Sequence, residues 1–151
     1  MKSEIFITGI GGEGVLTIGE ILANVFIKNN YTVSLYPFYG SQQRGGEVSC
    51  ILKINSNGNI INPTINSPDY YLVANDKHIE KYEKFKNEKT VVINLNEKDI
   101  HNKTKNMILL RQFIDSFKVI NKNDVIDELK KKFKKIEVLE KNLETFNSVE
   151  D

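Results

Sequence analysis

The fold of this chain is built on the segment Ile5-Phe6-Ile7-Thr8-Gly9-Ile10-Gly11-Gly12-Glu13-Gly14-Val15-Leu16-Thr17. β-Prone apolar residues run directly into four glycines, and an amphipathic helical pattern follows over residues 15–28. Glycine permits a positive φ and lets a backbone come close to a ligand or to another chain. A strand, a glycine loop and a helix in this order direct free N–H groups toward one point, which favours an anion.

The spacing Gly9-x-Gly11-x-x-Gly14 matches the dinucleotide-binding fingerprint in form. Its usual companion is an acidic residue at the end of the second strand, which holds a ribose hydroxyl, and residues 32–37 contain none. The Lys-Ser/Thr pair of a P-loop does not follow the last glycine either. We therefore expect the loop to meet a phosphate group or a partner backbone. The alternative is a tight turn that needs glycine only for packing.

A second glycine loop follows the strand that the pattern predicts over residues 32–36. It reads Pro37-Phe38-Tyr39-Gly40-Ser41-Gln42-Gln43-Arg44-Gly45-Gly46-Glu47 and has no apolar periodicity. Arg44 can present a bidentate fork to a phosphate or a carboxylate, the alternative being a surface salt bridge. If both glycine loops leave the carboxyl ends of neighbouring parallel strands, they face one ligand, because ligands of open α/β sheets bind at that edge.

The rest of the pattern predicts one α/β domain over residues 1–151. Strands are predicted over residues 4–8, 32–36, 47–54, 69–75 and 90–95, and helices over 15–28, 76–86, 107–117, 123–133 and 135–146. The first strand, helix and second strand form a βαβ unit, which predicts a parallel pair of strands. A hairpin signal at residues 56–59, with a return strand starting at Ile60-Ile61, makes the sheet mixed.

Composition excludes several classes of function. A net charge of +1 gives no electrostatic case for a nucleic acid or a membrane surface. The single cysteine, Cys50, excludes an internal disulfide and an iron–sulfur cluster held by this chain alone, and its alternating pattern predicts a small core residue. His78 and His101 stand apart, so no metal site is expected. With no signal peptide and no apolar run of about 20 residues, a cytoplasmic protein is expected.

Taken together, the two glycine motifs resemble those of the gamma subunit, or gamma domain, of the 2-oxoacid:ferredoxin oxidoreductases. The segments that carry the resemblance are residues 9–16 and residues 39–46. Pro68-Asp69 entering a buried strand, the segment 106–110 and the helix with Asn142-Leu143 are also similar to that family. The resemblance covers the whole chain, most strongly residues 1–95.

This resemblance implies a single three-layer α/β/α domain with a mixed, mostly parallel sheet and C-terminal helices. In that family, a complex of anaerobic metabolism decarboxylates a 2-oxoacid oxidatively, forms acyl-CoA and reduces ferredoxin. Thiamine diphosphate, magnesium and iron–sulfur clusters are then expected on the partner chains, which are the thiamine-binding alpha and beta subunits and a ferredoxin-like subunit. The gamma chain is expected to hold no catalytic residue, to be colourless and inactive alone, and to contribute to coenzyme A binding and to assembly of the hetero-oligomer.

The resemblance and the loop chemistry together indicate a set of residues that contact coenzyme A. They are Gly9, Gly11, Gly12, Gly14, Tyr39, Gly40, Ser41, Arg44, Gly45 and Gly46. The Tyr-Gly…Arg-Gly-Gly loop favours the 2-oxoglutarate type, then the pyruvate type, over the indolepyruvate type. The alternative from another class is a free-standing nucleotide-binding, phosphate-binding or regulatory module of the same fold.

Three positions depart from the family pattern. Glu13 stands where glutamine is usual, Gln42-Gln43 replaces a Pro-Glu-Met-type run, and Arg111 replaces a glycine. A carboxylate beside a phosphate site is unfavourable unless it faces away. The orientation of Glu13 is therefore a direct test of the predicted site.

Overall fold

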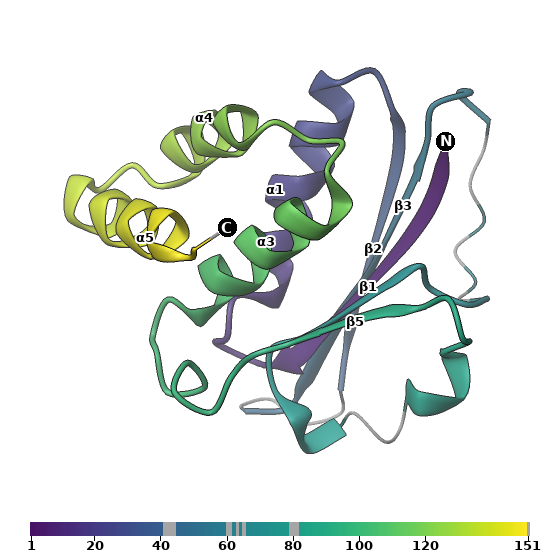
Figure 1. The fold of residues 1–151 in the computed structure, drawn as a ribbon, viewed down its shortest axis with the longest axis horizontal. Coiled ribbons are helices and arrows are strands. Elements are labelled where there is room, and N and C mark those ends of the chain that lie inside the picture. The colour runs from purple at the N-terminus through teal and green to yellow at the C-terminus, as the bar shows by residue number, and fades with distance from the viewer. Residues whose placement is uncertain (41–44, 60–61, 63, 65, 79–81, 151) are drawn as a thin grey trace.

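The computed structural model describes residues 1–40, 45–59, 62, 64, 66–78 and 82–150. Its strands are β1 (Lys2–Ile10), β2 (Thr32–Tyr39), β3 (Glu47–Asn55), β4 (Tyr70–Val73) and β5 (Val91–Asn94). Its helices are α1 (Val15–Lys28), α3 (Lys105–Phe117), α4 (Lys122–Lys132) and α5 (Ile136–Ser148), with short 3-10 helices η1 (Asp76–His78) and η2 (Glu83–Phe85). This arrangement confirms the predicted α/β class (Figure 1).

Strand β1 lies at the centre of the sheet, whose order is β2-β3-β1-β4-β5. It is parallel to β4 and antiparallel to β3, with Phe6 opposite Tyr71 on one side and Ile7 opposite Cys50 on the other. Because β3 is also antiparallel to β2, and β5 is parallel to β4, four of the strands described point the same way and β3 runs against them. The sheet is therefore mixed, as predicted.

The expectation that β1 and β2 are neighbours is wrong, because β3 lies between them. Burial explains this order. Seven consecutive residues at the end of β3 are buried, so the strand is most stable with a partner on each side. Strand β2 is only half-buried and exposed toward its end, and its Pro37 lacks an N–H group, which suits a strand at the edge. The chain thus runs from the central strand β1 through α1 to β2 at the edge of the sheet, and it then returns through β3, which lies beside β1.

The helices form two layers on one face of the sheet (Figure 1). Helices α1 and α3 pack directly on the strands, α1 over β2 and β3 and α3 over β4 and β5. Helices α4 and α5 then pack on α1 and α3. The layer order is therefore sheet, inner helices and outer helices, and the opposite face carries η1, η2 and their flanking segments in the part of the chain that the structure describes.

Most predicted elements lie where the pattern placed them. Helix α1 has the predicted bounds, and the three late helices differ from prediction by at most two residues at an end. Within the helix predicted over 76–86, residues 76–78 and 83–85 form the 3-10 helices η1 and η2, Tyr82 is helical, and residues 79–81 lie outside the described part. The predicted return strand at residues 60–61 also lies outside it. No helix among the described residues is long and apolar enough to cross a membrane.

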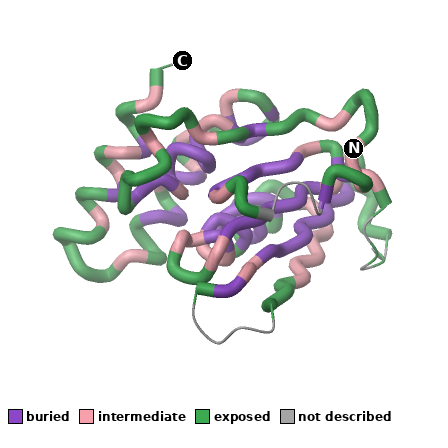
Figure 2. The backbone as a smooth tube through the Cα atoms, turned by 90° about the horizontal axis from the view of Figure 1, so that it is seen from below, coloured by how far each residue is buried: buried purple, intermediate pink, exposed green. Residues whose placement is uncertain are grey.

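The core has two parts because both faces of the sheet are partly covered. The larger part lies between the sheet and the helices and includes Cys50, which confirms the predicted core position. Burial raises the pKa of the Cys50 thiol to about 12. The smaller part, on the other face, consists of Phe6, Ile51, Tyr71, Val73 and Tyr82. Figure 2 shows the buried residues gathered in the strands and in the helix turns that face them.

Candidate functional site

The first glycine loop is a tight turn between β1 and α1. The Glu13 N–H donates to the Ile10 carbonyl at 3.2 Å, and Gly12 and Gly14 take φ angles of 89° and 76°. Both angles lie in the left-handed region that glycine adopts without strain. Gly14 is also the N-cap of α1 and has no side chain to cap the helix. The first N–H groups of a helix have no acceptor within the helix, so those of α1 are available to a ligand.

The two glycine loops meet at the same edge of the sheet. The Gly11 N–H donates to the Gly46 carbonyl at 2.9 Å, and the Gly40 N–H donates to the Glu47 carbonyl at 2.8 Å. Both loops lie at the edge where β1 and β2 end and where β3 begins. The predicted convergence is therefore present, although it comes from an intervening antiparallel strand instead of a neighbouring parallel pair.

A groove of about 510 Å³ lies between the loops. It is lined by Ile10, Gly11, Gly12, Gly14, Val15, Leu16, Thr17, Tyr39, Gly40, Gly45, Gly46, Glu47 and Val48. Much of this lining is glycine backbone, and the first turn of α1 forms one end of it. Backbone N–H groups at a helix N-terminus, with the positive end of the helix dipole, suit an anion such as a phosphate.

The predicted site residues divide into three groups. Seven of them line the groove, namely Gly11, Gly12, Gly14, Tyr39, Gly40, Gly45 and Gly46. Gly9 lies behind it, where a Cβ atom would come within 2.7 Å of Val15 Cγ2 and 3.0 Å of Ala74 Cβ, so this glycine serves close packing. Ser41 and Arg44, like Gln42-Gln43, lie outside the described residues.

The carboxylate of Glu13 faces the inside of the molecule. Its Oε1 atom accepts from the Ile10 N–H at 2.7 Å. Its Oε2 atom accepts from Asn75 Nδ2 at 3.3 Å and from the Lys105 ammonium group. Arg111, the other described departure, donates to Asp115 at 2.9 Å and to the Phe146 carbonyl at 3.0 Å, which joins α3 to α5. Neither departure competes with an anion in the groove.

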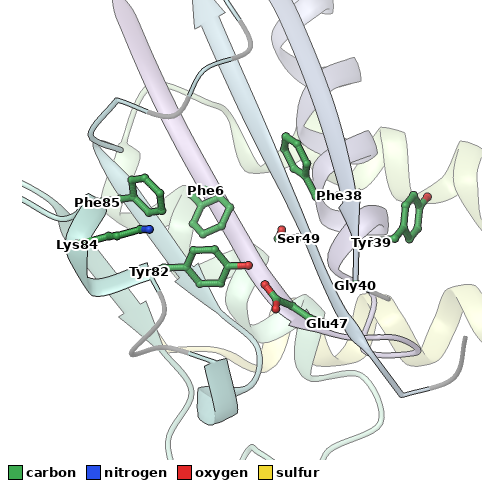
Figure 3. A pocket seen from close by; sticks show the side chains of 9 residues that line it. All are labelled: Phe6, Phe38, Tyr39, Gly40, Glu47, Ser49, Tyr82, Lys84 and Phe85. Carbon is green, nitrogen blue, oxygen red and sulfur yellow. The ribbon is translucent and has the colours of Figure 1, made fainter. Parts of the chain in front are cut away.

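A second hollow of about 300 Å³ lies on the sheet face opposite the helices (Figure 3). It is lined by Phe6, Phe38, Tyr39, Gly40, Glu47, Ser49, Tyr82, Lys84 and Phe85. In Figure 3 the Tyr82 ring and the Glu47 carboxylate point toward each other, while the Tyr39 ring turns away to the far side of β2. Composition and periodicity did not indicate this hollow, because its residues come from four separate segments.

No group of three or more His, Cys, Asp or Glu side chains able to hold a metal ion occurs among the described residues. His101 is exposed. The chemistry that the groove offers is therefore recognition of an anion by backbone donors, beside a neighbouring aromatic surface. Fold and groove together define an α/β domain with a glycine-lined groove at a helix N-terminus, a geometry that suits a phosphate-bearing ligand.

Comparison with known proteins identifies the family. The pyruvate ferredoxin/flavodoxin oxidoreductase family matches residues 4–101, and the chain belongs to this family. This confirms the resemblance that the glycine motifs indicated. The matched residues contain both glycine loops and all five described strands except the first two residues of β1.

The curated relatives are subunits of related oxidoreductases. The ketoisovalerate oxidoreductase subunit VorA of Methanothermobacter thermautotrophicus is 36% identical over 76 residues, which is 50% of this chain and 16% of VorA. The pyruvate synthase subunit PorC of Methanocaldococcus jannaschii is 30% identical over 100 residues, 64% of this chain and 56% of PorC. The chain thus spans less than two thirds of the length of either relative.

Solved structures share the fold. The gamma subunit of a keto/oxoacid ferredoxin oxidoreductase from Geobacter sulfurreducens superposes with a TM-score of 0.74 at 17% identity, over 96% of this chain and 94% of that subunit. The 2-oxoglutarate:ferredoxin oxidoreductase of Magnetococcus marinus, with 2-oxoglutarate, coenzyme A and succinyl-CoA bound, gives a TM-score of 0.81 at 20% identity. It is matched over 97% of this chain and 30% of that chain. The fold of this chain is therefore that of a gamma component.

Proposed function

We propose that residues 1–151 form the gamma component of a 2-oxoacid:ferredoxin oxidoreductase, an enzyme that converts a 2-oxoacid to acyl-CoA with reduction of ferredoxin. The proposal rests on the family match over residues 4–101 and on the whole-chain fold match to a gamma subunit. It also rests on the described lining of the groove, which offers no group of metal ligands and includes six glycines and the first turn of α1.

Within that complex, the groove between the glycine loops binds a phosphate-bearing part of coenzyme A. The observation that carries this assignment is the Gly11–Gly46 hydrogen bond, because it brings two glycine loops and the first turn of α1 to one place. Coenzyme A carries a diphosphate and a 3′-phosphate, and each suits backbone N–H groups at a helix N-terminus. Arg44 follows in the same loop as Gly40, Gly45 and Gly46 and supplies a cation to the same ligand.

The chemical steps belong to partner chains. Thiamine diphosphate with magnesium, when bound to the thiamine-binding alpha and beta subunits, supplies the decarboxylation chemistry, and iron–sulfur clusters on a ferredoxin-like subunit carry the electrons to ferredoxin. This chain has one cysteine, which is buried in the core, whereas a cluster needs about four thiolates. The gamma component orients coenzyme A and contributes to assembly of the cytoplasmic complex.

The preferred 2-oxoacid is 2-oxoglutarate, followed by pyruvate. The Tyr-Gly…Arg-Gly-Gly loop supports this order, and the Magnetococcus neighbour is a 2-oxoglutarate enzyme. The named curated relatives act on pyruvate and ketoisovalerate, so a substrate panel must include both of these and indolepyruvate. Co-purification of the tagged chain from its own source, followed by this panel, identifies the partners and the substrate together. Recovery of the chain without any thiamine-binding subunit favours the free-standing nucleotide-binding or regulatory module.

The assignment of coenzyme A is tested by Arg44→Ala in the assembled complex. Loss of one charge-assisted contact costs about 1.5–3 kcal/mol, which corresponds to an affinity weaker by roughly 10–150-fold. We expect the apparent KM for coenzyme A to rise by a factor in that range and the KM for the 2-oxoacid to change little. Lys141→Ala, on the exposed side of α5, is the control that removes a cation elsewhere. If the intact Arg44→Ala complex has unchanged coenzyme A kinetics, Arg44 does not contact coenzyme A. If the variant no longer co-purifies with its partner subunits, Arg44 is an interface residue instead.

A further inference from the structure

The acidic residue within the first glycine loop holds the loop from its inner side. Glu13 lies between Gly12 and Gly14, and only 11% of its side chain is exposed. Its carboxylate accepts from the end of β1 through the Ile10 N–H, from Asn75 just after β4, and from Lys105 at the start of α3. One side chain therefore ties the loop to three separate elements.

Helix α3 contacts the loop at two successive residues. The Lys105 side chain, which is 9% exposed, forms an ion pair with Glu13. The next residue, Asn106, packs against Gly14 so closely that a Cβ atom on Gly14 would lie 2.2 Å from Asn106 Nδ2. The two loop residues that precede α1 are thus in contact with the first turn of a helix about ninety residues further along the chain.

The start of α3 is itself fixed by the outer helix layer. The Thr104 and Thr145 hydroxyl groups are 2.6 Å apart, so the residue before α3 is hydrogen-bonded to α5. Arg111 joins the same two helices further along α3. The pairing of Lys105 with Glu13 therefore connects the glycine loop to a helix that is itself held in place by hydrogen bonds to α5.

We propose that the Glu13–Lys105 ion pair is a positioning pair that holds the glycine loop in the conformation that binds the anionic ligand. The loop contains three glycines between residues 11 and 14, and glycine loses more backbone entropy on ordering than any other residue. A loop that is already ordered does not lose that entropy again when the ligand binds, so its affinity is higher. An ion pair with both side chains only about one tenth exposed is weakly screened by salt.

The test separates the ion pair from the hydrogen bond within the same side chain. Glu13→Gln keeps an oxygen that accepts from the Ile10 N–H but removes the charge, and Lys105→Met removes the ammonium group and keeps the aliphatic stem. We expect either change to raise amide hydrogen exchange in residues 10–14 of the 151-residue chain by about tenfold. The double variant should match the single variants, because both remove the same interaction.

The ligand arm rests on the proposed function and uses coenzyme A as the probe. In the assembled complex, Glu13→Gln should raise the Kd for coenzyme A about tenfold, because binding must then order the loop again. The KM for the 2-oxoacid should stay within twofold. If the wild-type complex does not bind coenzyme A, the proposed function fails, and hydrogen exchange alone decides whether the pair positions the loop.

Glu4→Gln provides a matched control. Glu4 pairs with Lys53 at 3.3 Å, with side chains 12% and 7% exposed, and Glu4 lies near the other end of β1. Glu4→Gln removes a comparably buried ion pair that has no contact with the glycine loop. Any effect that comes only from a general loss of stability should therefore appear in this variant too. The proposal is overturned if Glu13→Gln and Glu4→Gln give the same exchange in residues 10–14. It is also overturned if a wild-type complex that binds coenzyme A loses no affinity on Glu13→Gln.

Discussion

Replacing Gly14 by alanine tests whether backbone conformation and packing together make this glycine necessary. Gly14 is the N-cap of α1 with a φ of 76°, which an L-residue adopts at a cost of roughly 1–2 kcal/mol. The added Cβ atom would also meet Asn106, at 2.2 Å from Nδ2, 2.7 Å from Cγ and 3.0 Å from Cβ. The Nδ2 and Cγ atoms give the two shortest contacts and are absent from an Asn106→Ala variant, whereas the Cβ of Asn106 is fixed to helix α3 and remains in it.

The magnitude follows from these two contributions. Overpacking a well-packed site costs about 1–3 kcal/mol, so Gly14→Ala should lower the free energy of unfolding by about 2–5 kcal/mol in total. In an Asn106→Ala background the side-chain clash is removed and only the tight Cβ contact remains. There Gly14→Ala should cost about 1–2 kcal/mol, which is the backbone contribution. The coupling between the two positions is then about 1–3 kcal/mol.

Urea unfolding of the four proteins of this cycle measures the coupling directly. The chain has no tryptophan, so tyrosine fluorescence and far-ultraviolet circular dichroism are followed together, and coincident transitions validate the two-state treatment. The control is Gly12→Ala, whose φ of 89° brings the same kind of backbone strain but whose Cβ would meet nothing within 4 Å. An equal cost of Gly14→Ala with and without the Asn106 side chain would refute the packing argument. A cost below about 0.5 kcal/mol would refute the backbone argument as well.

Three further changes have defined outcomes. Gly11→Ala adds a Cβ atom at 3.8 Å from the Gly46 carbonyl oxygen, so the free energy of unfolding in urea should change by less than about 0.5 kcal/mol. The affinity for coenzyme A, measured calorimetrically, should fall about tenfold, because the added methyl group occupies part of the groove. Burial raises the pKa of the Cys50 thiol from 9.0 to about 12, so its contribution to stability is complete below pH 9 and is lost as the pH rises toward 12. Above pH 9 the free energy of unfolding should therefore fall by about 1.4 kcal/mol per pH unit on account of Cys50. This contribution should be absent from Cys50→Ala when the two proteins are compared by urea unfolding from pH 8 to 10.5. Arg111→Met should lower the free energy of unfolding, measured by thermal unfolding, by about 2–3 kcal/mol, because it removes the donors to Asp115 and to the Phe146 carbonyl. It should also raise amide hydrogen exchange in α5.

Local patterns predicted those features that a few neighbouring residues control. The bounds of α1 follow from the 3.6-residue period after Gly14, and the loop before it follows from glycines that a tight turn requires. The second glycine loop and its place at the same edge as the first were also predictable, because each loop follows a strand that points the same way. The described ends of the helix predicted over 76–86 are 3-10 helices, and its full span stays a prediction because residues 79–81 lie outside the described part.

The neighbours of each strand were beyond local reasoning. A βαβ pattern specifies that β1 and β2 point the same way, but it does not say what lies between them. The place of β3 depends on how many apolar residues it can bury against two partners at once, which is a property of the assembled sheet. The same holds for Gly9, which matches the fingerprint spacing but packs against Val15 and Ala74 behind the groove.

Sequence patterns were sufficient to predict the α/β class, the two glycine loops, the helix that begins at the first of them and the family of the protein. Hydrophobic period and glycine position act over a few residues, so they can be recognised without knowing what the chain contacts elsewhere. The strand order, the groove lining and the inward direction of Glu13 became known only from the folded structure. These depend on Lys105, Asn75 and Gly46, which lie far from the first loop in the chain and come into contact with it only when the sheet and α3 are assembled.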